Sequence, residues 1–178
     1  MKITQFLYHT FISDFINEGS IVVDLGGNKG EFSKFIVDNF KSTVYVVEPM
    51  PDLFNSISNI PQIKKFQYCI SKEKEVEISI PENQCATVYD KNFANKILCK
   101  GITLEEFLDK NNIKKVGLLK VDIEGAEIEM FNITPDEVFK SIDQITVEFH
   151  DFIWPELNPE VEKIKERLKH LGFYEIKF

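Results

Sequence analysis

Arginine is almost absent from this chain of 178 residues, in which Arg167 is the only one. Aspartates and glutamates number 29 against 21 lysines and arginines, which gives a formal net charge of −8. Nucleic-acid phosphates attract basic surfaces, so this balance excludes nucleic acid as the expected partner. The three cysteines, Cys69, Cys85 and Cys99, have no metal-ligand spacing, and their odd number leaves at least one thiol unpaired. We therefore expect a reducing compartment, the cytoplasm.

Long hydrophobic runs are also missing. No apolar run approaches the roughly 20 residues that span a bilayer, and the first residues do not form a secretory h-region. The chain has 43% hydrophobic residues and no low-complexity tract or evident linker. These features predict a soluble, unexported protein with a single domain over residues 1–178.

The first 19 residues show a helical pattern. Apolar residues recur at helical spacing between Thr4 and Glu18, and Gly19 follows where a helix cap belongs. We predict an N-terminal helical extension over residues 1–19 that packs on the domain, with His9 on its surface. The apolar positions are Phe6, Leu7, Phe11, Ile12, Phe15 and Ile16.

Strand and helix patterns alternate along the rest of the chain. This alternation predicts an α/β fold with a doubly wound, mostly parallel sheet and helices on both faces. Such sheets bind ligands beyond the carboxyl ends of their strands. An alternating strand is expected at 75–80, near the third strand, and residues 82–100 suit a surface excursion. The predicted strands of the main alternation are 21–25, 43–48, 65–70, 116–122, 144–150 and 173–178, and the predicted helices are 31–40, 51–58, 103–110, 126–131, 135–141 and 159–171.

A glycine-rich turn follows the first of these strands. The dinucleotide fingerprint GxGxxG does not fit, because Asn28 and Glu31 stand where that pattern requires glycine and a small residue. The spacing that is present is DxGxxxG, from Asp24 through Gly26 to Gly30. It resembles the S-adenosylmethionine loop of Rossmann-like methyltransferases, and the alternative is a tight turn without a ligand.

Glu48, at the end of the second predicted strand, is the candidate ribose ligand. A carboxylate can accept hydrogen bonds from both ribose hydroxyls, and an acid such as Asp24 can orient around an ammonium group. Glycine lets the backbone approach a ligand closely. S-adenosylmethionine has no phosphates, so the missing pyrophosphate cradle fits this ligand.

A second group of polar residues follows two later strands. Asp122 and Glu124 come directly after the predicted strand 116–122. Glu148 and His150 occupy alternate positions of the strand 144–150, so period-two geometry places them on one face. We expect these four side chains to face one crevice at the ligand-binding edge of the sheet.

Three interpretations of this crevice stand side by side. Its oxygen and nitrogen donors suit a divalent cation such as Mg²⁺ or Mn²⁺. Without a metal, His150 or Asp122 would serve as general base, with Glu148 orienting the imidazole. The third interpretation is a polar network that only holds the loops. Lys120, inside an apolar strand, is expected to pair with a neighbouring acid.

Five segments together resemble the FkbM family of S-adenosylmethionine-dependent methyltransferases. The most specific is the KxDxEGxE run, and the resemblance covers roughly residues 20–178. It implies a Rossmann-like class I methyltransferase fold and O-methylation of a hydroxyl on a sugar, polyketide or related metabolite. The segments are VDLGGNKG (23–30), VEP (47–49), TLEEF (103–107), LKVDIEGAE (119–127) and VEFH (147–150).

The resemblance also implies roles for individual residues. The first loop would hold the methionine part of the cofactor, Glu48 the ribose, and residues 69–71 the adenine rim. The acceptor would face Asp122, Glu124, Glu148 and His150, which are the implied catalytic residues. The implied cofactor-binding residues are Asp24, Gly26, Gly27, Asn28, Gly30, Glu48, Pro49, Cys69, Ile70, Ser71 and Asp122.

This sequence departs from the family pattern in two places. Gly27 replaces a frequent alanine, which we expect to be tolerated, and the chain stops at the strand that ends in Phe178, without a final antiparallel strand. An open edge there would favour a homodimer.

The expected partner is a small-molecule or glycan acceptor. The alternative is a catalytically silent domain that binds S-adenosylmethionine or a nucleoside and acts through a partner; an NAD-dependent oxidoreductase is disfavoured by the failed fingerprint.

Overall fold

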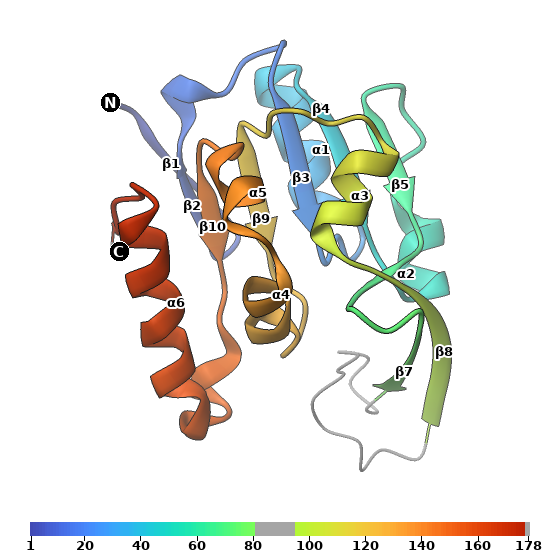
Figure 1. The fold of residues 1–178 in the computed structure, drawn as a ribbon. Coiled ribbons are helices and arrows are strands. Elements are labelled where there is room, and N and C mark those ends of the chain that lie inside the picture. The colour runs from blue at the N-terminus through green and yellow to red at the C-terminus, as the bar shows by residue number, and fades with distance from the viewer. Residues whose placement is uncertain (81–94, 177–178) are drawn as a thin grey trace.

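The fold is built on a parallel sheet of five strands in the order β10-β9-β3-β4-β5. The computed structural model describes residues 1–80 and 95–176 (Figure 1). All four neighbouring pairs in the sheet are parallel, so the carboxyl ends of the strands lie at one edge. The strands are β3 (Ile21–Leu25), β4 (Thr43–Val47), β5 (Ile63–Phe66), β9 (Leu118–Val121) and β10 (Ile145–Val147).

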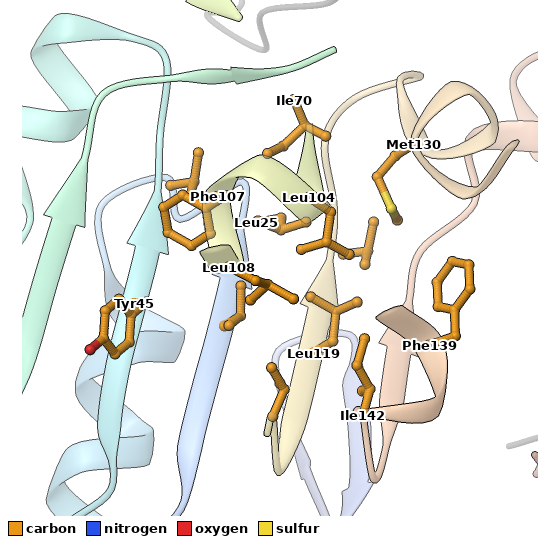
Figure 2. Close-up of a cluster of buried hydrophobic side chains, with 14 of the residues drawn as sticks. Leu25, Tyr45, Ile70, Leu104, Phe107, Leu108, Leu119, Met130, Phe139 and Ile142 are labelled. Carbon is orange, nitrogen blue, oxygen red and sulfur yellow. The ribbon is translucent and has the colours of Figure 1, made fainter. Parts of the chain in front are cut away.

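Helices cover both faces of this sheet, as the alternation predicts. Successive residues of a strand point to opposite faces, and Val22 and Val23 accordingly belong to two different hydrophobic clusters. The helices α3, α4, α5 and α6 supply buried residues to the cluster that contains Val23, and α1 to the other; Figure 2 shows the first cluster. The helices are α1 (Glu31–Phe40), α2 (Pro51–Ser56), α3 (Leu104–Lys110), α4 (Glu127–Ile133), α5 (Asp136–Lys140) and α6 (Asn158–His170). The doubly wound α/β prediction is confirmed.

Short-range sequence patterns predicted the bounds of several elements correctly. Helix α1 has the predicted bounds. At the start of α3, the Thr103 hydroxyl accepts a hydrogen bond from the Glu106 N–H at 3.1 Å, and the Glu106 carboxylate accepts one from the Thr103 N–H at 3.2 Å. This pair is a capping box at the start of the predicted helix 103–110, in which neighbours in the chain satisfy each other's hydrogen bonds.

The N-terminal helix prediction is wrong. Residues 1–12 instead form an antiparallel hairpin of β1 (Ile3–Phe6) and β2 (His9–Ile12), followed by a 3₁₀ turn η1 (Ser13–Phe15). Side-chain burial in β2 alternates with period two, and Phe6 stacks on Phe35 of α1 with ring centroids 4.2 Å apart. Packing against the domain therefore overrides the helical spacing, and His9, expected on the surface, is only 3% exposed.

The predicted strand 65–70 is two strands. β5 joins the main sheet, whereas β6 (Cys69–Ile70) pairs with β8 (Asn95–Ile102) in a second sheet of order β6-β8-β7. β7 (Glu75–Ile80) has the predicted bounds but pairs antiparallel with β8 rather than with the third strand. Of the expected excursion 82–100, residues 82–94 lie outside the described residues and the rest belong to β8.

The C-terminal strands are also shorter than predicted. β10 ends at Val147, and His150 begins a 3₁₀ turn η2 (His150–Phe152), which is followed by η3 (Pro155–Leu157). The predicted strand 173–178 is wrong over residues 173–176, which carry no strand, and residues 177–178 lie outside the described part. Within residues 171–176, the apolar residues after α6 thus form no strand beside β10.

Two further expectations can be compared with the described residues. Across 1–80 and 95–176, no helix is long and apolar enough to cross a membrane. Cys69 and Cys99 are buried free thiols, and Cys85 lies outside the described ranges. Burial raises the pKa of the Cys69 thiol to about 12, so this thiol stays protonated and unreactive at neutral pH.

Candidate active site

The loop after β3 is held tightly between two neighbouring strand ends. The N–H groups of Gly26 and Gly27 both donate to the carbonyl of Val47, at 2.9 and 3.0 Å. Gly26 has φ +79°, and a Cβ built there would lie 1.6 Å from the carbonyl oxygen of Asp122. Only glycine combines this backbone conformation with so close an approach. The loop therefore sits directly against the residues that follow β9.

Gly27 has less room for a side chain than the alanine frequent in the resembling family suggests. A Cβ at position 27 would lie 2.1 Å from Cγ2 of Val46, a fully buried side chain. We expect Gly27→Ala to lower the free energy of unfolding by about 1–3 kcal/mol, the usual cost of overpacking a core. In a Val46→Ala background the same change should cost clearly less, as urea unfolding of the four proteins would show. Equal costs in both backgrounds would contradict the packing argument.

Asp24 and Lys120 lie beneath the loop. The Ser33 hydroxyl donates to Asp24 Oδ2 at 2.7 Å, and Lys120 Nζ lies 3.2 Å from Asp24 Oδ1. Lys120 also donates to the carbonyls of Gly26 at 2.6 Å and Leu25 at 3.3 Å. The expected pairing of Lys120 with an acid is confirmed. Asp24 is fully buried and its oxygens face these two partners, so it supports the loop from below.

One pocket lies above the loop at the carboxyl edge of the sheet. It holds about 650 Å³ of empty space, part of it open to solvent. Ser71 does not line it, and its hydroxyl donates to Glu129 at 3.1 Å. The candidate site residues that line it are Gly26, Asn28, Glu48, Pro49, Cys69, Ile70, Asp122 and Glu124. The candidates outside its lining are Asp24, Gly27, Gly30, Ser71, Glu148 and His150.

Glu48 connects the end of β4 with the loop. Its carboxylate accepts hydrogen bonds from the N–H of Asn28 at 2.8 Å and from the N–H of Met50 at 2.9 Å. Glu48 is only 4% exposed, and burial raises its pKa to about 7, although both backbone donors act in the opposite direction. Each carboxylate oxygen can accept more than one hydrogen bond, so Glu48 retains accepting capacity toward the pocket.

His150 is held by Glu127. Its Nδ1 lies 3.1 Å from Glu127 Oε1, while its Nε2 lies 3.4 Å from Glu124 and 3.9 Å from Asp122. The prediction that Glu148 orients this imidazole is therefore wrong. It assumed that a strand continues to residue 150, whereas β10 ends at Val147 and His150 belongs to a 3₁₀ turn.

Glu127 is a site residue that no sequence pattern singled out. It is 2% exposed at the start of α4, and its carboxylate accepts hydrogen bonds from the N–H groups of Ile123 and Gly125. These bonds close a turn in which Glu124 and Gly125 both have positive φ. The available signal was the final E of the KxDxEGxE run, but an acid at a helix start also suits the helix dipole alone.

The charged groups in this cluster shift one another's pKa values. Burial alone would lower the pKa of His150, but the hydrogen bond and charge of Glu127 and the charges of Glu124 and Asp122 raise it to about 9. Burial would raise the pKa of Asp122, yet the hydrogen bond from His9 and the charge of Lys120 hold it below its usual value. Burial raises the pKa of Glu124. An imidazolium therefore faces carboxylates at neutral pH.

The four predicted cluster residues divide into two groups that share Asp122. Donor atoms of Asp122, Glu124 and His150 lie within 4.8 Å of one another, and so do those of His9, Asp122 and Glu148. Each group combines one imidazole nitrogen with two carboxylates. Glu148 is thus grouped with His9 and Asp122 rather than with His150.

Fold and site together define a Rossmann-like domain with a glycine turn after its first parallel strand and an acid after its second. Residues 24–174 match the family model described as the methyltransferase FkbM domain. The chain belongs to the FkbM methyltransferase family, which confirms the resemblance seen in its motifs.

One relative and one solved structure illustrate what this chain is similar to. "Methyltransferase 1" of Beauveria bassiana (strain ARSEF 2860) is 25% identical, over 75% of this chain and 66% of that protein. A solved structure of a putative methyltransferase from an antibiotic biosynthesis pathway of Anabaena variabilis ATCC 29413 is 14% identical, with a TM-score of 0.42. That match covers 76% of this chain and 41% of the solved chain. This chain thus spans only part of the length of both.

Proposed function

We propose that this chain is an S-adenosylmethionine-dependent O-methyltransferase that acts on a hydroxyl of a sugar, polyketide or similar small metabolite. The observation that carries the proposal is one pocket with two kinds of wall. Gly26, Asn28 and Glu48, which follow β3 and β4, contribute one part of its lining, here called the first wall, and Asp122 and Glu124, which follow β9, contribute the second wall. A cofactor and an acceptor bound in this pocket would therefore lie next to each other.

The residues of the first wall fit S-adenosylmethionine. The close packing of Gly26 leaves backbone rather than side chain facing the ligand, and Glu48 would accept the ribose hydroxyls. Cys69 and Ile70 provide an apolar wall suited to adenine. S-adenosylmethionine would supply an electrophilic methyl group. Asp24, Gly27, Gly30, Pro49 and Ser71 would shape the loop and rim.

The second wall would hold the acceptor hydroxyl and take its proton. Positioning of the hydroxyl supplies most of the rate enhancement, and a base assists. His150, with its pKa raised to about 9, carries a proton at neutral pH and so does not accept another. Glu124 lines the pocket and has a raised pKa, which makes its carboxylate the stronger base there. Asp122 would orient the hydroxyl, with Glu148 beside it.

A divalent cation is the alternative for this wall. Asp122, Glu124 and His150 would hold it, since their donor atoms lie within 4.8 Å of one another. Binding would displace the proton from His150 Nε2, because a metal ligand must offer its lone pair. A metal-dependent site would therefore release a proton on adding Mg²⁺ or Mn²⁺, whereas a metal-free site would not.

Titration calorimetry with S-adenosylhomocysteine tests the proposal. We expect micromolar binding by the chain, weakened about 100-fold in Glu48→Ala, since charged hydrogen bonds contribute about 1.5–3 kcal/mol each. Glu156→Ala, a change at an exposed acid, is the matched control. Titrations after chelation and with added Mg²⁺ or Mn²⁺ separate the metal alternative. No binding under any condition would overturn the proposal, and binding without turnover on any acceptor would favour the catalytically silent alternative.

The affinity for S-adenosylhomocysteine should rise with pH through about 7. Burial raises the pKa of Glu48 to about 7 from its ordinary 4.5, so the carboxyl is protonated below that pH in the free protein. Only the ionised form accepts hydrogen bonds with both oxygens, so the dissociation constant should increase about tenfold per pH unit below 7. Calorimetry between pH 5.5 and 8.5 measures this slope. Glu48→Gln should remove it, and a retained slope would assign the dependence to another group.

The raised pKa of Glu48 also makes the stability of the fold depend on pH. A carboxyl whose pKa is raised by folding stabilises the folded state fully below the unfolded pKa, near 4.5, and loses that contribution as the pH rises through about 7. Bound cofactor should offset this loss, because its hydroxyls would satisfy the ionised carboxylate.

A further inference from the structure

The N-terminal hairpin carries a buried histidine that the family comparison does not cover. The family model matches residues 24–174, and His9 lies before that span, at the start of β2. Its neighbours Leu7 and Tyr8 are 51% and 84% exposed, whereas His9 is 3% exposed. Burial of an imidazole has a cost unless its nitrogens find partners, so the contacts of His9 are informative.

Both ring nitrogens of His9 face polar partners. Nε2 lies 3.5 Å from Asp122 Oδ2, and Nδ1 lies 3.4 Å from the hydroxyl oxygen of Thr146 on β10. An unprotonated Nε2 would place a lone pair against a carboxylate. The favourable arrangement therefore has hydrogen on Nε2, with the Thr146 hydroxyl donating to Nδ1 when the ring is neutral.

The hairpin is fixed firmly enough to place this side chain. The Gln144 side chain accepts from the Ile12 N–H at 2.8 Å and donates to the Ile12 carbonyl at 3.1 Å. The rings of His9 and Phe32 pack in a T-shaped arrangement with centroids 5.6 Å apart. Contacts to both β10 and α1 therefore set the position of His9.

We infer that His9 is a positioning residue that holds the Asp122 carboxylate in the orientation facing the pocket. Lys120 Nζ lies 3.5 Å from the same oxygen of Asp122, and His150 Nε2 lies 3.9 Å from the other oxygen. Without His9, the carboxylate is free to turn toward these two cations. This inference rests on the proposed function, in which Asp122 orients the acceptor hydroxyl.

NMR spectroscopy of selectively labelled protein tests the inference without an acceptor. In protein with [¹³C]aspartate, His9→Leu should move the carboxyl resonance of Asp122, which is assigned with Asp122→Asn. His9→Gln, whose amide can donate from the position of Nε2, should restore most of the shift. Thr146→Val keeps the side-chain shape, removes the hydroxyl and should also move the resonance. His170→Leu, at an exposed histidine of α6, is the control.

The outcomes separate this inference from the proposed function. Since the chain has three histidines, [¹⁵N]histidine labelling also reports the protonated nitrogen of His9 directly. An unmoved Asp122 resonance in folded His9→Leu, or hydrogen on Nδ1 alone, would overturn the inference; if His9→Leu does not fold, Thr146→Val decides. Absence of S-adenosylhomocysteine binding with the resonance shifts present would overturn the proposed function alone.

Discussion

Replacing Gly26 with alanine is expected to abolish S-adenosylhomocysteine binding and to destabilise the fold. The new Cβ would lie 1.6 Å from the Asp122 carbonyl oxygen, which belongs to backbone that cannot move aside as a flexible side chain can. The positive φ of 79° adds strain. Together we expect a loss of about 3–5 kcal/mol in the free energy of unfolding, since strain at such a site costs about 1–3 kcal/mol and the clash adds to it. Urea unfolding and calorimetry measure the two effects.

Gly172→Ala is the matched control for the conformational part. Gly172 has φ +97°, but a Cβ there would meet nothing within 4 Å. Its replacement should cost only about 1–2 kcal/mol, the price of a left-handed conformation, and should leave ligand binding unchanged. If both variants lose equal stability and both bind ligand, the close contact between the loop and Asp122 does not shape the site.

Lys120→Met is expected to be the other severe change. Within the described parts of the chain, Asp24 Oδ1 is buried without a hydrogen bond, and Lys120 at 3.2 Å supplies the opposing charge. The same ammonium group satisfies the carbonyls of Leu25 and Gly26. Removing one partner of a buried ion pair costs about 3–5 kcal/mol. Thermal and urea unfolding should show this loss, together with weaker S-adenosylhomocysteine binding because the loop loses its support.

A double-mutant cycle isolates the charge pair. Asp24→Asn with Lys120→Met should be more stable than the sum of the single losses predicts, because the double variant leaves no unpaired buried charge. Lys115→Met is the control, since Lys115 is 71% exposed and its pair with Asp143 is worth at most about 1 kcal/mol. Additive losses in the cycle would mean that Lys120 acts through the carbonyls alone.

The elements that sequence reasoning placed well depend on neighbours in the chain. The capping box at Thr103 and Glu106 joins residues three apart, and α1 begins after the glycine loop as its pattern predicts. The buried strands β3, β4 and β9 are largely apolar, interrupted by Asp24 and Lys120, and such near-continuous runs point to a parallel sheet covered on both faces. The carboxyl edge of that sheet then brings Glu48 and Asp122 to one pocket without further information.

The errors fall where distant segments decide the local structure. The apolar residues of 1–12 have helical spacing. In the structure, Phe6 stacks on Phe35 of α1. Phe11 packs in a T-shaped arrangement with Phe32 of the same helix, and the hairpin places both side chains there. Because that packing is set by tertiary contacts, the burial of His9 could not be derived from its neighbours. The strand predicted to reach His150 likewise ends three residues earlier.

The sequence by itself determined the doubly wound sheet, the glycine loop and the family, because these follow from periodicity and from short motifs. Only the tertiary structure decided that Glu127 holds His150, that Lys120 supports the loop beneath Gly26, and that His9 approaches Asp122. The Glu127–His150 contact joins residues 23 apart in the chain, and the Lys120–Gly26 contact joins residues 94 apart. Side-chain partnership over such separations depends on where whole elements pack, which local pattern does not specify.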